Sequence, residues 1–117
     1  MEGARILLVD DEASLLDLLR RYLERLGYQV DSFLKPEEAL AHFESDPARY
    51  DLVLTDLSLP VMRGDEMLAR MRQRSPKLRA IVSSGYPYKS PVKRTKSLQK
   101  PFLPKMLAEQ IEELLKT

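Results

Sequence analysis

Residues able to carry out chemistry stand where short apolar runs of this sequence end. The set consists of Asp10 and Asp11 after residues 6–9, Asp56 after residues 52–55, Ser84 after residues 78–83, and Lys100 directly before Pro101. Three carboxylates that lie close together repel one another strongly, unless a cation neutralises them or some of them are protonated. If these side chains meet in the fold, we therefore expect them to form a binding site for a cation.

The composition restricts which cation that could be. The chain has no cysteine and a single histidine, His42, so neither a thiolate site nor a histidine cluster can form. Ligands that are all oxygen favour a hard divalent ion such as Mg²⁺, which accepts a phosphate oxygen as a further ligand. Lys100 and Ser84 could then hold phosphoryl oxygens while one carboxylate attacks phosphorus. The residues are therefore suited to phosphoryl transfer.

Strands and helices alternate along the sequence in a way that would bring these residues together. Apolar runs predict strands at residues 6–9 and 52–55, and residues 28–33 and 78–83 also match strands. Apolar positions at helical spacing predict helices at residues 13–26, 36–44, 65–74 and 104–116. Such alternation favours a parallel sheet with helices on both faces and ligands at the carboxyl ends of the strands.

Residues 84–100 break this regular pattern. Pro87 and Pro91 exclude a long helix, and residues 95–99 contain only Leu98 as a strongly apolar residue. We expect any fifth strand here to lie at the edge of the sheet, where a polar strand is tolerated. We also expect the fourth helix to be truncated or irregular.

The length and the charges indicate one domain that does not span a membrane. A chain of 117 residues can bury one core, so we predict a single domain over residues 1–117. No apolar stretch approaches the roughly 18 residues of a membrane span and no signal peptide is evident, so we expect a cytoplasmic protein. Acidic residues dominate residues 1–66, whereas residues 67–108 carry only basic charges. Solvated helix faces explain such a split more often than a nucleic-acid surface does.

Four blocks of the sequence resemble the signature blocks of response-regulator receiver domains. They are residues 9–12 (VDDE), residues 51–60 (DLVLTDLSLP) with Gly64, residues 83–86 (SSGY) and residues 100–102 (KPF). The blocks occur in the family's order and cover nearly the whole chain. The resemblance implies a flavodoxin-like, doubly wound α/β fold whose five-stranded parallel sheet has the order 2-1-3-4-5.

The same resemblance implies a role for each candidate residue. Asp56 would accept the phosphoryl group, and Mg²⁺ would be bound by Asp10, Asp11, Asp56 and the backbone carbonyl of Ser58. Ser84 would be the switch hydroxyl, and Lys100 would contact the phosphoryl group and precede a cis peptide bond to Pro101. The donor would be a phosphohistidine on a sensor histidine kinase or a histidine phosphotransfer protein.

The expected function is two-component phosphorelay signalling, in which phosphorylation switches residues 84–100. The receiver would catalyse its own phosphorylation without turning over a separate substrate, so we do not expect an enzyme. We expect no output domain within this chain, and the sequence does not identify its output partner.

The chain departs from the family pattern in two respects. The stretch from Ser84 to Lys100 is shorter than the family's fourth helix and its connection. In addition, Ser97 stands three places before the lysine, where the family has an aromatic switch residue. Tyr86 or Tyr88 could replace that aromatic ring, and otherwise we expect the two-position switch to be blunted.

Other functions fit the sequence less well. A flavin mononucleotide carrier of the same fold needs a loop rich in Ser, Thr and Gly after the first strand, where Asp10, Asp11 and Glu12 would repel the phosphate. A phosphatase of the haloacid-dehalogenase type carries a second Asp two residues after its nucleophile, where Ser58 stands here. The intact set of acids, hydroxyl and lysine argues against a pseudo-receiver that serves only as an interaction module, whereas the irregular stretch between Ser84 and Lys100 permits one. Tyr86, Tyr88 and nearby basic residues could bind single-stranded nucleic acid, but a solvated loop is the commoner explanation.

Overall fold

Five short strands form one parallel sheet in the order β2-β1-β3-β4-β5. In the computed structural model, which describes residues 3–116, the strands are β1 (Arg5–Val9), β2 (Gln29–Phe33), β3 (Leu52–Asp56), β4 (Arg79–Ser84) and β5 (Thr95–Gln99). The helices are α1 (Ala13–Arg25), α2 (Pro36–Ser45), α3 (Gly64–Arg74) and α4 (Pro104–Leu115), with a short 3₁₀ helix at Pro47–Arg49. The expected doubly wound α/β fold and its strand order are confirmed.

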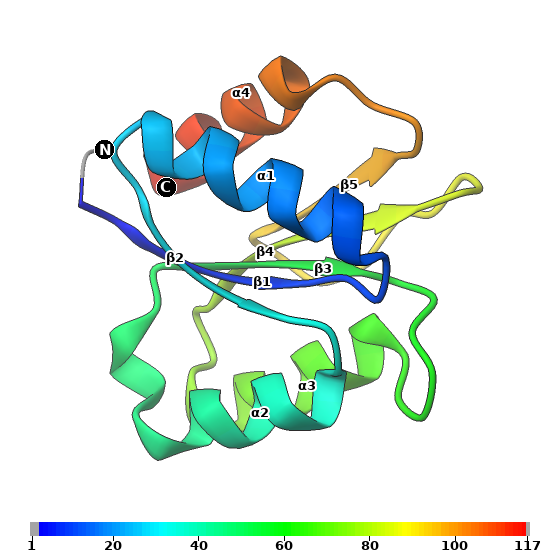
Figure 1. The fold of residues 1–117 in the computed structure, drawn as a ribbon. Coiled ribbons are helices and arrows are strands. Elements are labelled where there is room, and N and C mark those ends of the chain that lie inside the picture. The colour runs from blue at the N-terminus through cyan, green and yellow to red at the C-terminus, as the bar shows by residue number, and fades with distance from the viewer. Residues whose placement is uncertain (1–2, 117) are drawn as a thin grey trace.

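Helices cover both faces of the sheet (Figure 1), with α1 and α4 on one face and α2 and α3 on the other. Successive side chains of a strand point to opposite faces, so the interior strand β1 contributes to both cores. Ile6 and Leu8 pack on the side of α1 and α4, whereas Leu7 and Val9 pack on the side of α2 and α3. All four are buried, which explains why β1 is a continuous apolar run. Within residues 3–116, no helix has the length and apolar character needed to cross a membrane.

The end of α1 is capped by a glycine, which sets the start of β2. Gly27 has a φ of 100°, in the left-handed region that favours glycine. Its N–H donates to the carbonyl of Glu24 (3.0 Å), and the N–H of Tyr28 donates to the carbonyl of Leu23 (3.2 Å). This pair of bonds is a Schellman motif, and it satisfies carbonyls that the end of the helix would otherwise leave without donors.

Residues 85–94 connect β4 to β5 without forming a helix. We expected a truncated or irregular helix between β4 and β5, but the structure has no helix there. Pro87 and Pro91 lack the N–H that a helix needs, which explains the irregular path. Tyr88 still packs against the core on the α2 and α3 side, and its hydroxyl lies 3.5 Å from Oδ2 of Asp65. As expected, β5 is an edge strand.

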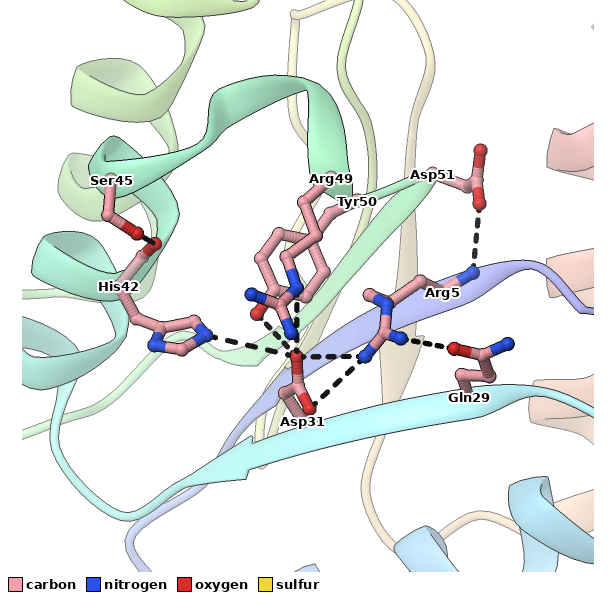
Figure 2. Close-up of polar contacts among 8 residues, drawn as sticks. All are labelled: Arg5, Gln29, Asp31, His42, Ser45, Arg49, Tyr50 and Asp51. Atoms are coloured by element: carbon pink, nitrogen blue, oxygen red, sulfur yellow. Dashed lines mark hydrogen bonds and ion pairs between the residues drawn. The ribbon is translucent and has the colours of Figure 1, made fainter.

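A polar cluster around Asp31 fastens the opposite edge strand, β2, to its neighbours (Figure 2). The Asp31 carboxylate accepts hydrogen bonds from the Tyr50 hydroxyl (2.6 Å) and the Arg5 guanidinium (3.3 Å). Arg49 and His42 approach the same carboxylate at 3.8 and 3.9 Å. Partial burial raises the pKa of Asp31, but these hydrogen bonds and positive charges outweigh it and hold the pKa below its ordinary value. The carboxylate therefore stabilises the fold in its charged form.

Asp31→Asn should lower the free energy of unfolding near pH 7 by about 1–3 kcal/mol, because hydrogen bonds to a charged group are lost. A lowered folded-state pKa means that this contribution is present above the unfolded pKa of about 3.9 and is lost as the pH falls through the folded value. In urea unfolding, the difference between wild type and variant should therefore shrink below about pH 4. Glu44→Gln, which removes an exposed carboxylate, should change little at either pH. An equal difference at pH 3 and pH 7 would contradict this assignment.

Candidate functional site

Three acidic side chains meet at the carboxyl ends of β1 and β3, the strands between which the sheet order reverses. Asp10 and Asp11 directly follow β1, and Asp56 is the last residue of β3. One carboxylate oxygen from each lies within 4.8 Å of the other two. Asp10 and Asp56 are only 2% and 7% exposed, while Asp11 faces solvent. Reversal points of this kind are where doubly wound folds bind ligands.

Lys100 brings a positive charge to these acids from the far end of the chain. Its Nζ lies 2.9 Å from Oδ2 of Asp10 and 3.6 Å from Oδ1 of Asp56. The Lys100 N–H donates to the carbonyl of Ser84 (2.7 Å), which ties the ends of β4 and β5 together. The peptide bond from Lys100 to Pro101 is cis, as the resemblance implied. Lys100 is thus positioned by its backbone hydrogen bond to Ser84 as well as by its ion pairs with Asp10 and Asp56.

The electrostatics of the site follow from burial and crowding. Burial raises the pKa of Asp56, Lys100 opposes this, and the neighbouring charges of Asp10 and Asp11 add to it, so the pKa lies above its ordinary value. Burial lowers the pKa of Lys100, but its contacts with Asp10 and Asp56 outweigh burial and the pKa is raised. Lys100 carries one positive charge against three carboxylates. A site for a further cation therefore fits the charge balance of these residues.

Ser84 and Ser58 lie near the acids but differ in setting. Ser84 ends β4 and is buried, and its hydroxyl oxygen accepts a hydrogen bond from the N–H of Tyr86 (3.1 Å). That hydroxyl is therefore engaged with the connection that follows β4. Ser58 is exposed in the segment between β3 and α3. Its assignment as a carbonyl ligand stays a prediction.

Ser97 lies on β5, where the family has an aromatic residue, and a hollow of about 230 Å³ lies beside it. The hollow is lined by Ser84, Tyr86, Tyr88 and Ser97, among others. Tyr86 is half exposed, whereas Tyr88 packs against the core. Both tyrosines considered as replacements for the aromatic switch residue therefore border the space beside Ser97.

Thr55, for which the sequence indicates no role, adjoins the site. Its side chain is fully buried, and its hydroxyl donates to the backbone carbonyl of Asp56 (2.9 Å). Gly64, the first residue of α3, packs against the same carbonyl, since a β-carbon there would lie 2.1 Å from the Asp56 oxygen. The only signal in the sequence was a hydroxyl residue inside an otherwise apolar strand.

Curated proteins with similar sequences include response regulators and a sensor kinase. ResD, a transcriptional regulatory protein of Bacillus subtilis, is 43% identical over 60% of this chain and 28% of its own length. CpdR, a response regulator receiver protein of Brucella abortus, is 31% identical over 95% of this chain and 96% of its own length. The sensor kinase CckA of Brucella abortus is 31% identical over 97% of this chain and 13% of its own length. The chain thus spans nearly all of CpdR but less than a third of ResD.

Solved structures and a family model agree with these relatives. A response regulator receiver protein from Sinorhizobium medicae superposes with a TM-score of 0.90 at 27% identity, covering 99% of this chain and 97% of its own. TrrA from Thermotoga maritima, solved in complex with Mg²⁺ and BeF, has a TM-score of 0.84 at 32% identity, covering 95% and 98%. The family model of the response regulator receiver domain matches residues 6–112. This chain therefore belongs to the response regulator receiver domain family.

Proposed function

We propose that this chain is a Mg²⁺-dependent phosphoacceptor of a two-component phosphorelay, with Asp56 as the acceptor. The observation that carries this proposal is the Lys100 ammonium, 2.9 Å from Asp10 and 3.6 Å from Asp56, beside three clustered carboxylates. A carboxylate nucleophile, an acidic cation site and a fixed positive charge are the parts that phosphoryl transfer needs.

The ion would be held by the carboxylates of Asp10, Asp11 and Asp56 and by the backbone carbonyl of Ser58. These ligands are all oxygen, which suits Mg²⁺, and the single charge of Lys100 leaves negative charge for the ion to neutralise. When bound, Mg²⁺ would neutralise charge on the phosphoryl oxygens. The Mg²⁺ and BeF complex of the related TrrA supports this choice of ion.

In the proposed transfer, a carboxylate oxygen of Asp56 attacks phosphorus while the bond from phosphorus to the donor's imidazole nitrogen breaks. Lys100 already lies near Asp56 and would hold a phosphoryl oxygen. Ser84 would turn its hydroxyl from the Tyr86 N–H toward the phosphoryl group. We propose an autocatalytic phosphoacceptor rather than an enzyme, because Ser58 stands where dehalogenase-type phosphatases carry their general acid.

The donor that we propose is a phosphohistidine on a sensor histidine kinase or a histidine phosphotransfer protein. Family membership and the similarity to the sensor kinase CckA support this donor. Receiving phosphoryl groups from such a donor would place the chain in the cytoplasm. We propose no nucleic-acid partner, because Lys96 is paired with Glu113 at 2.9 Å and a solvated loop accounts for the exposed Lys89 and Lys93.

Phosphorylation would switch residues 84–100. Ser84 ends β4 and Lys100 directly follows β5. The two residues are joined by a backbone hydrogen bond, and both would contact the phosphoryl group. Its arrival would therefore act on both ends of the segment between them. Ser97 has no ring to move between two positions, so we propose a population shift within the segment in place of the family's aromatic switch.

Acetyl phosphate with Mg²⁺ should add one phosphoryl group to the wild-type chain, at Asp56, as detected by mass spectrometry. Asp56→Asn should abolish the label because it removes the nucleophile, and chelation of Mg²⁺ should do the same. Asp46→Asn, which removes an exposed carboxylate beyond the end of α2, should be labelled like the wild type. A label that persists on Asp56→Asn would show that another residue is the acceptor, and an unlabelled wild type would exclude the function.

Amide hydrogen exchange should slow across residues 85–99 when beryllofluoride and Mg²⁺ are added, because a phosphoryl mimic bound by Ser84 and Lys100 would restrain both ends of this segment. Exchange in α2, which carries none of the proposed ligands, should stay unchanged and serves as the internal control. Strong protection of residues 85–99 without the mimic, or fast exchange that the mimic leaves unaltered, would contradict the proposed switch.

A further inference from the structure

The backbone carbonyl of Asp56 is held by a hydroxyl from the preceding residue. Thr55 is fully buried, and its Oγ1 donates to the Asp56 carbonyl at 2.9 Å. On the other side, Gly64 lies so close to this carbonyl that a β-carbon there would stand 2.1 Å away. The carbonyl is thus confined between a hydrogen-bond donor and the first residue of α3.

The same peptide unit is fixed at its other end. The N–H of Leu57, which shares this peptide plane with the Asp56 carbonyl, donates to the carbonyl of Ser83 on β4 (2.8 Å). The carbonyl of Leu57 in turn accepts a hydrogen bond from the N–H of Gly64 (2.9 Å). The backbone that leaves Asp56 is therefore oriented by β4, by α3 and by the Thr55 hydroxyl.

We infer that Thr55 is a positioning residue for phosphorylation, acting through the backbone of Asp56. This inference rests on the proposed function of Asp56. In-line attack requires the nucleophilic oxygen to be placed to within a fraction of an ångström, and the peptide plane after Asp56 sets where its side chain starts. Without the hydroxyl, the buried carbonyl loses this donor, and the peptide unit, still held through the Leu57 N–H, can tilt toward another donor. The carboxylate and the Ser58 backbone two residues further on would shift with it.

A threonine that bonds a carbonyl can also be purely structural, and the half-buried Thr95 is such a case for comparison. On β5, the Thr95 hydroxyl donates to the carbonyl of Lys93 (3.2 Å) and accepts a hydrogen bond from Arg72 (2.6 Å). This threonine lies at the amino-terminal end of an edge strand, away from the carboxyl ends where the acids meet. Loss of the Thr95 hydroxyl should weaken the fold without touching the phosphoacceptor, so Thr95 supplies the matched control.

The test compares the rates at which acetyl phosphate labels the wild type, Thr55→Val, Thr55→Ser and Thr95→Val at saturating Mg²⁺. Thr55→Val keeps the shape and removes the hydroxyl, whereas Thr55→Ser keeps the hydroxyl and removes the methyl. Maximal rates are corrected for the folded fraction found by urea unfolding. Should Thr55→Val not fold, Thr55→Cys, whose thiol is a weak donor, takes its place with the same expected loss.

The maximal rate of Thr55→Val should fall by about tenfold or more, the half-saturating donor concentration should stay the same, and Thr55→Ser should recover most of the rate. Thr95→Val should be labelled at the wild-type rate. Labelling of Thr55→Val at the wild-type maximal rate, or a loss that Thr55→Ser does not recover, would overturn the inference while leaving Asp56 as the acceptor. An unlabelled wild type would instead remove the proposed function itself.

Discussion

The mutual repulsion of the carboxylates of Asp10, Asp11 and Asp56 is the constraint on which the rest of this structure depends. Two of these acids are almost fully buried, and burying charge is costly unless a partner compensates. Lys100 compensates part of it, but burial, together with the charges of Asp10 and Asp11, still holds the pKa of Asp56 above its ordinary value. The architecture holds these groups together because β1 and β3 are neighbours at the centre of the sheet and cannot move apart without exposing both cores.

Strands β1 and β3 support this cluster in a different way from strands β4 and β5. β1 and β3 carry the acids on strands buried on both faces, which makes that part of the site rigid. Ser84 and Lys100 come from β4 and β5, and the connection between these strands has no helix. One backbone hydrogen bond joins their ends at the site, and Tyr88 anchors the connection to the core. A phosphoryl group would therefore lie between the rigidly held acids on one side and Ser84 and Lys100, which can move more easily, on the other.

Much of the fold follows from the sequence, because it depends on local patterns. The buried runs at residues 6–9 and 52–55, the helical spacing in α1 and α4, and Gly27 after α1 each place an element to within a residue or two. The sequence also indicated that β5 would be an edge strand, since Leu98 is its only strong apolar residue.

Other features depended on contacts between distant residues, and no local pattern reports those. The prolines at 87 and 91 predicted a truncated or irregular helix, whereas the structure has no helix between β4 and β5, and Tyr88 of this connection packs against the core. The bond from Thr55 to the Asp56 carbonyl depends on how closely α3 approaches β3 at Gly64. In the sequence, nothing distinguishes Asp31 from the other acids. The fold places Arg5, Tyr50 and Arg49 around its carboxylate.

A titration with Mg²⁺, followed through the backbone amide shifts of residues 10–12 and 56–58, tests the cation site most directly. If the three acids share the ion, Asp11→Asn should weaken Mg²⁺ binding by about tenfold or more, because it removes a ligand and one of the charges that attract the ion. Asp17→Asn, which removes a carboxylate paired with Arg20 at 2.7 Å on α1, should leave the affinity unchanged. Equal affinity in the wild type and Asp11→Asn, or shifts that cluster elsewhere in the chain, would contradict the account.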